Sequence, residues 1–280
     1  MTEAPLTVNS LLAQAQDADQ RSDLRVLLSA TLQQSFAWLY THGDHVPDAA
    51  LLQRFHQLWQ ARLAGQPVAY LLGQREFHGL PFLTSPAALI PRSDTEVLVD
   101  ALLERLSATQ ALHVLDLGTG TGAIGLTLAV RRPVWRITLT DRSPAALALA
   151  TRNAQALGVA DRVRLLSGDW LRALPAGERF DAIASNPPYI ADADPHLQQG
   201  DLRFEPAEAL RAGPDGLADL QALAAGAPAH LRPGAWLALE HGHDQGPAVR
   251  SLLTASGLAD VQTLRDLAGH ERVGLGRAAH

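Results

Sequence analysis

The chain of 280 residues contains no cysteine, which excludes disulfides, thiolate metal sites and a cysteine nucleophile. It also lacks an uninterrupted apolar run of the roughly 18 residues that a membrane-spanning helix needs. Its opening residues do not follow the basic-then-apolar order of a signal peptide. The net charge is -6, whereas a protein that binds mainly to nucleic-acid phosphates usually presents a basic face. These absences predict a cytoplasmic protein, by default a monomer, that binds neither membranes nor nucleic acid directly.

The spacing of apolar residues changes along the chain. Residues 1–74 show only helical spacing of apolar residues, at Leu24–Tyr40 with Asp23 as the expected cap, and at Ala49–Leu63. A further helical turn is expected at Val68–Leu72. This region therefore predicts a small helical domain, too small to hold a deep pocket alone.

The rest of the chain reads as a hairpin followed by an α/β domain. Residues 75–93 are extended and punctuated by Gly79 and by prolines, which predicts a β-hairpin linker. In 94–280, apolar strands alternate with helices, which predicts a mainly parallel sheet covered on both faces, with ligands at the carboxyl ends of its strands. The seven expected strands are His113–Leu117, Arg136–Thr140, Val163–Leu166, Phe180–Ala184, Ala235–Leu239, Val261–Leu264 and Arg272–Leu275. The expected helices are Asp94–Leu106, Ala123–Val130, Pro144–Leu157, Gly216–Leu231 and Gln245–Ser256.

A glycine-rich loop, Asp116-Leu-Gly-Thr-Gly-Thr-Gly122, follows the first of these strands and opens a helix. Glycines let the backbone turn tightly and let a ligand approach the main chain, and a helix start adds a cradle for it. Asp141 ends the next strand, where a carboxylate can accept both ribose hydroxyls. Asp169 and Trp170 end the third, where a carboxylate could reach an adenine amine and an indole could face the base.

Two cofactors fit a glycine loop with a ribose carboxylate: a dinucleotide and S-adenosylmethionine. Dinucleotide folds usually keep G-x-G-x-x-G, in which the third glycine allows close helix packing. Here glycine occupies every second place after Asp116, which suits a cofactor without a pyrophosphate. A nicotinamide-dependent oxidoreductase stays open as an alternative, although no lysine proton donor can be assigned on this rim.

The glycine loop together with Asn186-Pro-Pro-Tyr189 resembles the class I S-adenosylmethionine-dependent methyltransferases that act on planar amino or amide nitrogens. Further stretches narrow the resemblance to the peptide chain release factor glutamine methyltransferase family. One departure is Ser93, where family members usually carry proline, which puts local rigidity in doubt and not the activity. The stretches that carry the narrower resemblance are Ile90–Glu96 (IPRSDTE), Asp192–Pro206 (DADPHLQQGDLRFEP), Gly213–Leu217 (GPDGL), Glu240–Gly242 (EHG) and Asp266–Arg272 (DLAGHER).

The resemblance implies a Rossmann-like class I methyltransferase domain that methylates the side-chain amide nitrogen of the glutamine in the Gly-Gly-Gln motif of release factors. S-adenosylmethionine is the implied methyl donor, and the helical domain is implied to help hold the release factor. No metal is expected, because His241 and His243 lack a convincing further ligand set. By matching position, the residues implied to bind the cofactor are Gly118, Thr119, Gly120, Thr121, Gly122, Asp141, Trp170 and Asn186. Those implied to hold the target glutamine are Asn186, Pro187, Pro188 and Tyr189.

The side chains and carbonyls of the segment Asn186–Tyr189 are suited to hold an amide group that accepts a methyl group. The Asn186 side-chain oxygen can accept one N–H of the target amide, and the Pro187 backbone carbonyl can accept the other. The prolines hold these groups outward, since each disfavours a helical conformation in the residue before it. Tyr189 supplies a flat face for the amide plane. We therefore expect Asn186, Pro187 and Tyr189 to be catalytic through positioning and electrostatics, without a general base.

Other functions and roles stay open at this point. An adenine-amine methyltransferase of DNA or RNA shares the same two-acceptor logic with a flipped-out base, but normally adds a recognition domain and a basic groove. A non-catalytic, cofactor-binding scaffold is a further alternative. Arg92, Asp94 and Glu96 either border the site or cap the following helix. Arg203 and Glu205 either brace the loop after Asn186-Pro-Pro-Tyr189 or form an ordinary surface ion pair.

Overall fold

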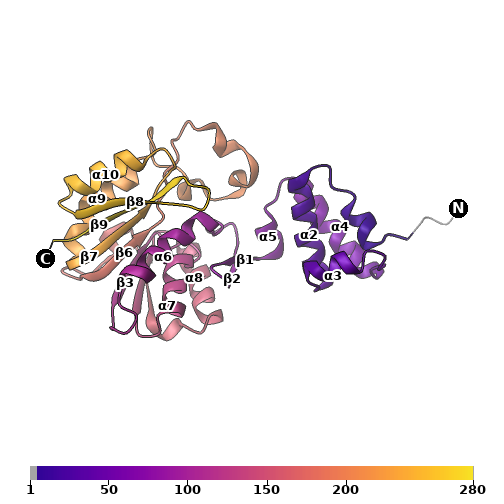
Figure 1. Ribbon diagram of the computed structural model, residues 1–280, viewed down its shortest axis with the longest axis horizontal. Coiled ribbons are helices and arrows are strands. Elements are labelled where there is room, and N and C mark those ends of the chain that lie inside the picture. The colour runs from indigo at the N-terminus through magenta and orange to yellow at the C-terminus, as the bar shows by residue number, and fades with distance from the viewer. Residues whose placement is uncertain (1–4, 280) are drawn as a thin grey trace. The chain divides into compact units, whose positions relative to one another are not determined.

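The computed structural model describes residues 5–279, which fall into two compact units divided between Gly73 and Gln74 (Figure 1). The division lies beside the expected end of the helical region. None of the described helices is long and apolar enough to cross a membrane.

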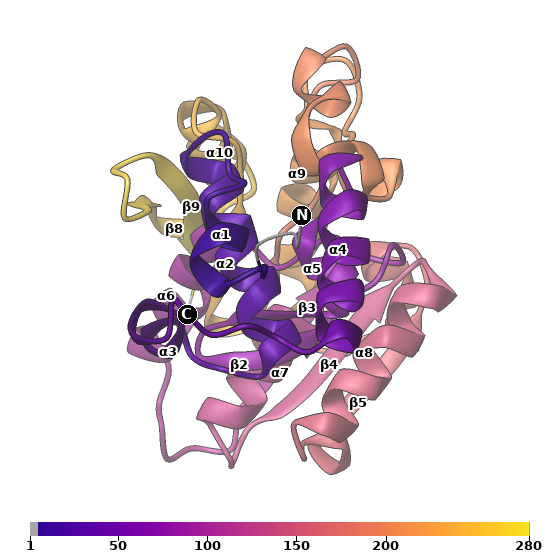
Figure 2. The ribbon, with the colours of Figure 1, turned by 90° about the vertical axis from the view of Figure 1, so that its right-hand side faces the viewer.

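The first unit is a bundle of five helices around its own apolar core. Helix α2 packs against α4, and both can be followed in Figures 1 and 2. The core is made by leucines of the first two helices together with the aromatic rings of Phe55 and Trp59. The helices are α1 (Val8–Leu12), α2 (Ala18–Leu32), α3 (Phe36–Thr41), α4 (Ala49–Leu63) and α5 (Val68–Leu72).

One expectation for this unit is wrong: Leu24–Tyr40 is not a single helix. The helix begins earlier, because the Asp17 carboxylate caps it by accepting a hydrogen bond from the Gln20 backbone N–H at 2.8 Å. It ends at Gln33, which adopts the left-handed conformation (φ 54°), and a new helix follows. Asp23 does not cap a helix but forms an ion pair with Arg62 of α4 at 2.6 Å.

The second unit combines a small hairpin with a seven-stranded sheet. Its elements are β1 (Gln74–Phe77), β2 (Leu80–Leu83), η1 (Ser93–Thr95), α6 (Glu96–Arg105), β3 (His113–Leu117), α7 (Ala123–Arg131), β4 (Arg136–Asp141), α8 (Pro144–Ala156), η2 (Ala160–Arg162), β5 (Val163–Ser167), η3 (Trp170–Ala173), β6 (Phe180–Ser185), η4 (Pro195–Gln198), η5 (Gly200–Phe204), η6 (Ala207–Ala209), α9 (Ala218–Gly226), η7 (Ala227–His230), β7 (Leu231–Glu240), α10 (Gly246–Ala255), β8 (Ala259–Arg265) and β9 (Glu271–Arg277).

The sheet confirms the predicted fold class. Its strand order is β5-β4-β3-β6-β7-β9-β8, in which the first five strands are parallel and β9 runs antiparallel to both of its neighbours. The expected helix Gly216–Leu231 is too long, because the chain tightens into η7 around Pro228. Leu231 already belongs to β7, where it pairs with Phe180.

Helices cover the sheet on both faces, with α6, α7 and α8 on one side and α9 and α10 on the other (Figure 1). Residues that alternate along a strand point to opposite faces. On one face, Val114 and Ala182 pack in the core cluster that includes α6, α7 and α8. On the other, Leu115 and Ile183 pack in the cluster that includes α9 and α10. The two strand faces therefore explain why these strands are apolar at almost every position.

The register of the parallel strands decides where the site forms. Leu117 at the end of β3 pairs with Thr140 of β4 on one side and with Ser185 of β6 on the other. Ser185 in turn pairs with Leu239 of β7. The residues that follow these strand ends therefore gather on one rim at the middle of the sheet, where open α/β sheets bind ligands.

Candidate active site

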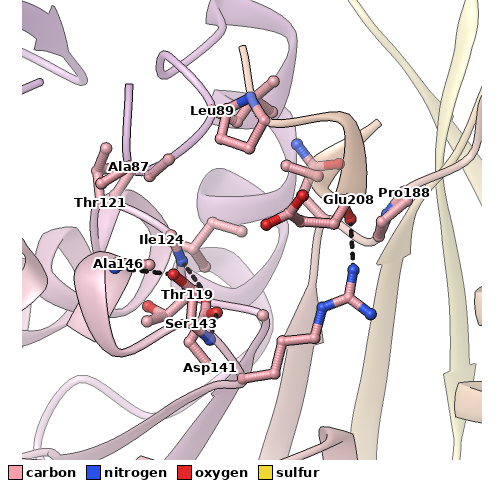
Figure 3. Close-up of a pocket in the computed structure, with 18 of the residues that line it drawn as sticks. Ala87, Leu89, Thr119, Thr121, Ile124, Asp141, Ser143, Ala146, Pro188 and Glu208 are labelled. Atoms are coloured by element: carbon pink, nitrogen blue, oxygen red, sulfur yellow. Dashed lines mark hydrogen bonds between the residues drawn. The ribbon is translucent and has the colours of Figure 1, made fainter. Parts of the chain in front are cut away.

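A pocket of about 970 Å³, its open mouth included, lies on this rim. In Figure 3, Thr121 and Ile124 lie on one side of it, and Pro188 and Glu208 lie on the other. The sequence had pointed to the glycine loop, the ends of the next strands and the residues after β6. The pocket lining includes Arg92, one of the residues that were expected to border the site or cap the next helix, and it adds residues 87–91, Thr95, Pro206, Glu208 and Ala209.

The glycine loop forms one wall of the pocket and closes tightly over it. Gly118 (φ 67°) and Gly120 (φ 55°) adopt left-handed conformations, and both line the pocket with Thr119 and Thr121. A Cβ on Gly118 would lie 2.7 Å from the Trp170 ring, so only glycine admits this approach. These glycines therefore leave the main chain open to a ligand.

Gly122 has a different place from the other residues of the loop. It is not among the pocket-lining residues but caps the start of α7 with φ 87°. A Cβ there would lie 2.5 Å from the Leu126 side chain. Its position fits a turn into the helix, whereas direct contact with a cofactor stays a prediction.

Asp116 fixes the glycine loop through hydrogen bonds, a role that was not predicted from the sequence. Its Oδ2 accepts hydrogen bonds from the Thr119 hydroxyl at 2.6 Å and the Gly125 N–H at 3.0 Å. Its Oδ1 is buried without a partner among the described residues. Burial raises the pKa of Asp116 to about 7, against the lowering effect of these hydrogen bonds.

Asp141 is fixed at the end of β4 by two backbone donors. Its Oδ2 accepts from the Gly120 N–H at 2.9 Å, and its Oδ1 accepts from the Ser143 N–H at 2.9 Å. Ser143, not Asp141, caps helix α8, because its hydroxyl accepts from the Ala146 N–H at 3.2 Å. Asp141 thus lines the pocket as a rigid carboxylate whose remaining lone pairs can accept ligand hydroxyls.

Trp170 also lines the pocket and carries backbone strain. Its φ of 45° is left-handed, which is uncommon for a bulky residue and is found where the surroundings impose it. Its indole N–H donates to Asp219 Oδ1 at 3.0 Å, at the first turn of α9. The neighbouring Asp169 lines the pocket too, but its side chain is 54% exposed and lies 3.7 Å from Arg172. Its role toward an adenine amine stays open.

The bond between Trp170 and Asp219 yields a first prediction. Asp219→Ala removes one hydrogen bond, worth about 0.5–1.5 kcal/mol, and frees the indole to move. We expect the Kd for S-adenosylmethionine to rise roughly two- to tenfold by calorimetry. Asp219→Asn keeps the accepting oxygen and is the matched control, with a Kd near that of the unaltered protein. Equal Kd values for both variants and the unaltered protein would contradict this role.

The residues after β6 lie partly in the pocket wall. Asn186 and Pro188 line the pocket, whereas Pro187 and Tyr189 are not among the lining residues. The Asn186 side chain donates through Nδ2 to the Thr95 hydroxyl at 3.1 Å. The Tyr189 ring is partly buried against the second core cluster, and its hydroxyl donates to Glu240 Oε1 at 3.3 Å. A stacking role of Tyr189 on a target amide therefore stays a prediction.

Glu205 is not part of a surface ion pair with Arg203. Its side chain is buried, and it accepts from the Ile90 N–H at 2.9 Å and from Arg92 at 2.5 Å. Arg203 is exposed and lies over the Phe204 ring. Glu205 thus braces the pocket segment Ile90–Arg92, and the alternative of an ordinary surface pair is wrong.

A hydrogen bond also links two other segments of the pocket lining. Arg142 donates to the Glu208 carbonyl at 3.0 Å, drawn as a dashed line in Figure 3. Both residues line the pocket: Arg142 lies in the turn that follows β4, and Glu208 lies in η6. Neither this bridge nor the role of Thr95 was foreseen, because the sequence gives no local pattern for contacts between distant loops. The matching IPRSDTE stretch was the one pointer to this region.

Comparison with known proteins places this geometry in a family. The model of the methyltransferase small domain matches residues 93–211, and that of the PrmC N-terminal domain matches 7–73. A release factor glutamine methyltransferase of Xylella fastidiosa (strain Temecula1) is 53% identical over 268 residues, which are 96% of this chain and 97% of that one. The chain belongs to the release factor glutamine methyltransferase family. It is therefore a methyltransferase, as the resemblance implied.

Further relatives agree with this assignment. The family member of Escherichia coli (strain K12) is 46% identical over 257 residues, 92% of each chain. Among solved structures, a methyltransferase from Pyrococcus furiosus has a TM-score of 0.55 at 20% identity, over 79% of this chain and 98% of that one. A T. thermophilus 16S rRNA methyltransferase in complex with AdoMet and guanosine has a TM-score of 0.54 at 24% identity, over 73% of this chain and 49% of that one. At these identities the structural likeness is one of fold.

Proposed function

We propose that this protein transfers a methyl group from S-adenosylmethionine to the side-chain amide nitrogen of the glutamine in the Gly-Gly-Gln motif of peptide chain release factors. The observation that carries the proposal is the Asn186 amide on the pocket wall. Its Nδ2 is engaged by Thr95, so its Oδ1 is the end left to accept a hydrogen bond. Membership of the family supports the glutamine as the acceptor.

The residues of the pocket fit the proposed cofactor. Gly118 and Gly120 leave a cradle that a Cβ would obstruct or strain, and the fixed Asp141 carboxylate is suited to two ribose hydroxyls. The half-buried Trp170 offers an indole beside the loop. Thr119, Thr121 and Asn186 would complete the cofactor contacts, and Gly122 would turn the chain into α7. No group of three histidine, aspartate or glutamate side chains in 5–279 could hold a metal ion, and a metal-free reaction stays part of the proposal.

The chemistry then depends on how the acceptor nitrogen is held. When bound, S-adenosylmethionine supplies a methyl group on a sulfonium, which is already a good leaving group. The amide nitrogen is the difficult partner, because its lone pair is delocalised into the carbonyl. Asn186 Oδ1 would accept one N–H and the Pro187 carbonyl the other, which would draw the nitrogen toward a tetrahedral shape and aim its lone pair at the methyl group.

The same two oxygens would stabilise the positive charge that develops on the acceptor nitrogen during transfer. As the nitrogen–carbon bond forms and the sulfur–carbon bond breaks, the nitrogen becomes positive, and two preorganised acceptors stabilise it. The surplus proton on nitrogen then leaves to water, so no general base is required. Pro188 on the pocket wall and the Tyr189 ring would confine the amide plane. The helical unit would hold part of the release factor, and we expect a monomer that acts in the cytoplasm.

The proposal is tested by incubating a release factor with this protein and S-adenosylmethionine. We expect mass spectrometry to find a gain of one methyl mass on the peptide that contains Gly-Gly-Gln, located on the glutamine side chain. A release factor with that glutamine replaced by alanine is the control and should gain nothing. Transfer of labelled methyl groups mainly to DNA or RNA offered in parallel would overturn the proposal in favour of an adenine-amine methyltransferase.

A further inference from the structure

The proposed mechanism requires the Pro187 carbonyl to keep one direction within the substrate loop, Asn186–Tyr189. A backbone carbonyl turns with its peptide plane, so its direction depends on how the two ends of the loop are held. At the first end, Ser185 pairs within the sheet and the Asn186 amide donates to Thr95. The second end is Tyr189, which is not among the pocket-lining residues. The contacts of Tyr189 therefore decide how firmly the loop presents its carbonyl.

The side chain of Gln245 holds the Tyr189 backbone. Its Nε2 donates to the Tyr189 carbonyl at 3.0 Å and to the Gly216 carbonyl at 3.2 Å. Its Oε1 accepts from the Gly242 N–H at 2.8 Å. Both N–H groups of this carboxamide and its oxygen are therefore used, and a flipped amide would set donor against donor and acceptor against acceptor. These contacts fix the Gln245 side chain in one orientation.

The three residues that contact the Gln245 amide come from separate stretches of the chain. Tyr189 ends the substrate loop, Gly216 belongs to the GPDGL stretch and Gly242 ends the EHG stretch. Gly216 lies two residues before α9, and Gln245 lies directly before α10, which packs against α9 (Figure 1). GPDGL and EHG carried part of the family resemblance but had no role in the site. Gln245 joins both stretches to the substrate loop.

Two further contacts make Tyr189 a rigid anchor. Its hydroxyl donates to Glu240 Oε1 at 3.3 Å, and its ring packs against the second core cluster. The N–H of the next residue, Ile190, donates to the Leu210 carbonyl at 2.9 Å. The peptide plane after Tyr189 is therefore held on both edges, through its oxygen by Gln245 and through its N–H by Leu210.

Pro188 lets this anchor act on the carbonyl that precedes it. Its ring fixes φ at about -65°, so few backbone torsions separate the anchored plane from the Pro187 carbonyl. Release of the Tyr189 carbonyl would add rotation about ψ of Tyr189, and the Pro187 carbonyl would then sample more directions. A displacement of about 1 Å in a positioning group can cost roughly a hundredfold in rate.

We propose that Gln245 is a positioning residue for methyl transfer: by fixing the Tyr189 carbonyl, it sets the direction of the Pro187 carbonyl that receives the target amide. This inference rests on the proposed function of the pocket. A clasp that only joined the starts of α9 and α10 would need no more than the contacts to Gly216 and Gly242. The shorter of the two bonds from Nε2 goes instead to the substrate loop.

Gly216 shows how closely this contact is built. Its φ is 72°, and a Cβ there would collide with the Tyr189 carbonyl oxygen and lie 2.9 Å from Gln245 Nε2. Gly213, in the same stretch, has φ 78°, but a Cβ there would lie 3.5 Å from the Ala218 Cβ, an ordinary contact. The two glycines are thus matched in backbone conformation and differ in their approach to the substrate loop.

This glycine pair gives the first test, by methyl-transfer kinetics on a release factor. Gly216→Ala should lower kcat roughly ten- to a hundredfold, because its methyl group pushes the Tyr189 carbonyl away from Gln245. Gly213→Ala is the matched control: it carries the same left-handed strain and should keep kcat within about twofold. The Kd for S-adenosylmethionine should stay near normal in both variants, since Asp141 and the glycine loop are untouched. Equal losses of kcat in the two variants would overturn the inference.

Gln245→Glu tests the side chain itself without adding bulk. It keeps an oxygen for the Gly242 N–H but sets a second oxygen against two carbonyls, so it no longer holds Tyr189. We expect kcat to fall roughly ten- to a hundredfold with little change in the Kd for S-adenosylmethionine, and near-normal turnover would contradict the role. Gln221→Glu, the same change at an exposed position of α9, is the control and should leave kcat unchanged. Added to Gly216→Ala, Gln245→Glu should cause little further loss, because both break one contact.

Hydrogen exchange decides the inference even if the unaltered protein fails to methylate release factors. The Ile190 N–H, bonded to the Leu210 carbonyl, reports whether the anchored plane stays in place. It should exchange roughly tenfold faster or more in Gln245→Glu and in Gly216→Ala, and at the unaltered rate in Gly213→Ala. Unchanged protection in the first two variants would refute the anchor. A release factor left unmethylated by the unaltered protein would instead reject the proposed function.

Discussion

Asn186→Ala is expected to lower kcat roughly 10²- to 10³-fold, the usual loss when one preorganised group that stabilises developing charge is removed. The Asn186 amide is held by Thr95 at 3.1 Å on the pocket wall, so its oxygen needs no reorganisation when the target amide binds. In the proposed mechanism, truncation would leave the Pro187 carbonyl as the remaining acceptor. Steady-state transfer from labelled S-adenosylmethionine to a release factor measures the loss.

Two accompanying measurements show whether the loss comes from chemistry. The Kd for S-adenosylmethionine should rise far less than kcat falls, because Asp141 and the glycine loop are untouched. The melting temperature should stay close to that of the unaltered protein, since Asn186 is only partly buried. Near-normal turnover in Asn186→Ala would remove the basis of the proposed mechanism.

Asp141→Ala is expected to weaken the binding of S-adenosylmethionine roughly 10²- to 10³-fold, because hydrogen bonds to a charged acceptor are worth about 1.5–3 kcal/mol each. Two ribose hydroxyls would lose their acceptor. The loop would also lose the bond from the Gly120 N–H at 2.9 Å that keeps it closed. Calorimetry on the free protein measures the Kd directly, without any substrate.

A matched variant controls for the change of charge. Asp161→Ala removes a carboxylate from an exposed position outside the pocket and should leave the Kd unaltered. At saturating cofactor, Asp141→Ala should recover much of its kcat, because Asn186 and its partner are intact. If Asp141→Ala bound the cofactor as tightly as Asp161→Ala, the ribose role of Asp141 would have to be abandoned.

The strands of the sheet could be predicted because each is marked by the apolar residues of its own short segment. Short, mostly apolar runs such as Phe180–Ala184 are typical of buried strands when they alternate with longer helical segments. The helical unit was predicted less well at one place. Periodicity alone ran Leu24–Tyr40 together, and the break at Gln33 is a single left-handed residue without a glycine to announce it.

The site was predictable to the extent that it follows strand ends. Gly118 and Asn186 come directly after a parallel strand and Asp141 ends one, and parallel strands present their carboxyl ends on one edge. The sequence did not place Tyr189 against Glu240, nor Glu205 beneath Ile90–Arg92. Those contacts join segments whose closeness depends on how loops fold over the rim.

By itself, the sequence predicted the chemistry of the rim: a glycine cradle, a carboxylate placed for a ribose, and an amide side chain followed by two prolines. Backbone conformation and strand direction act over a few residues, so these features can be read from spacing. Only the tertiary structure decided which end of the Asn186 amide faces the pocket. Thr95, 91 positions away in the sequence, accepts from Asn186 Nδ2 at 3.1 Å, and this hydrogen bond exists only after the chain has folded around the sheet. The physical reason is that a hydroxyl has no fixed direction until its partners are in place.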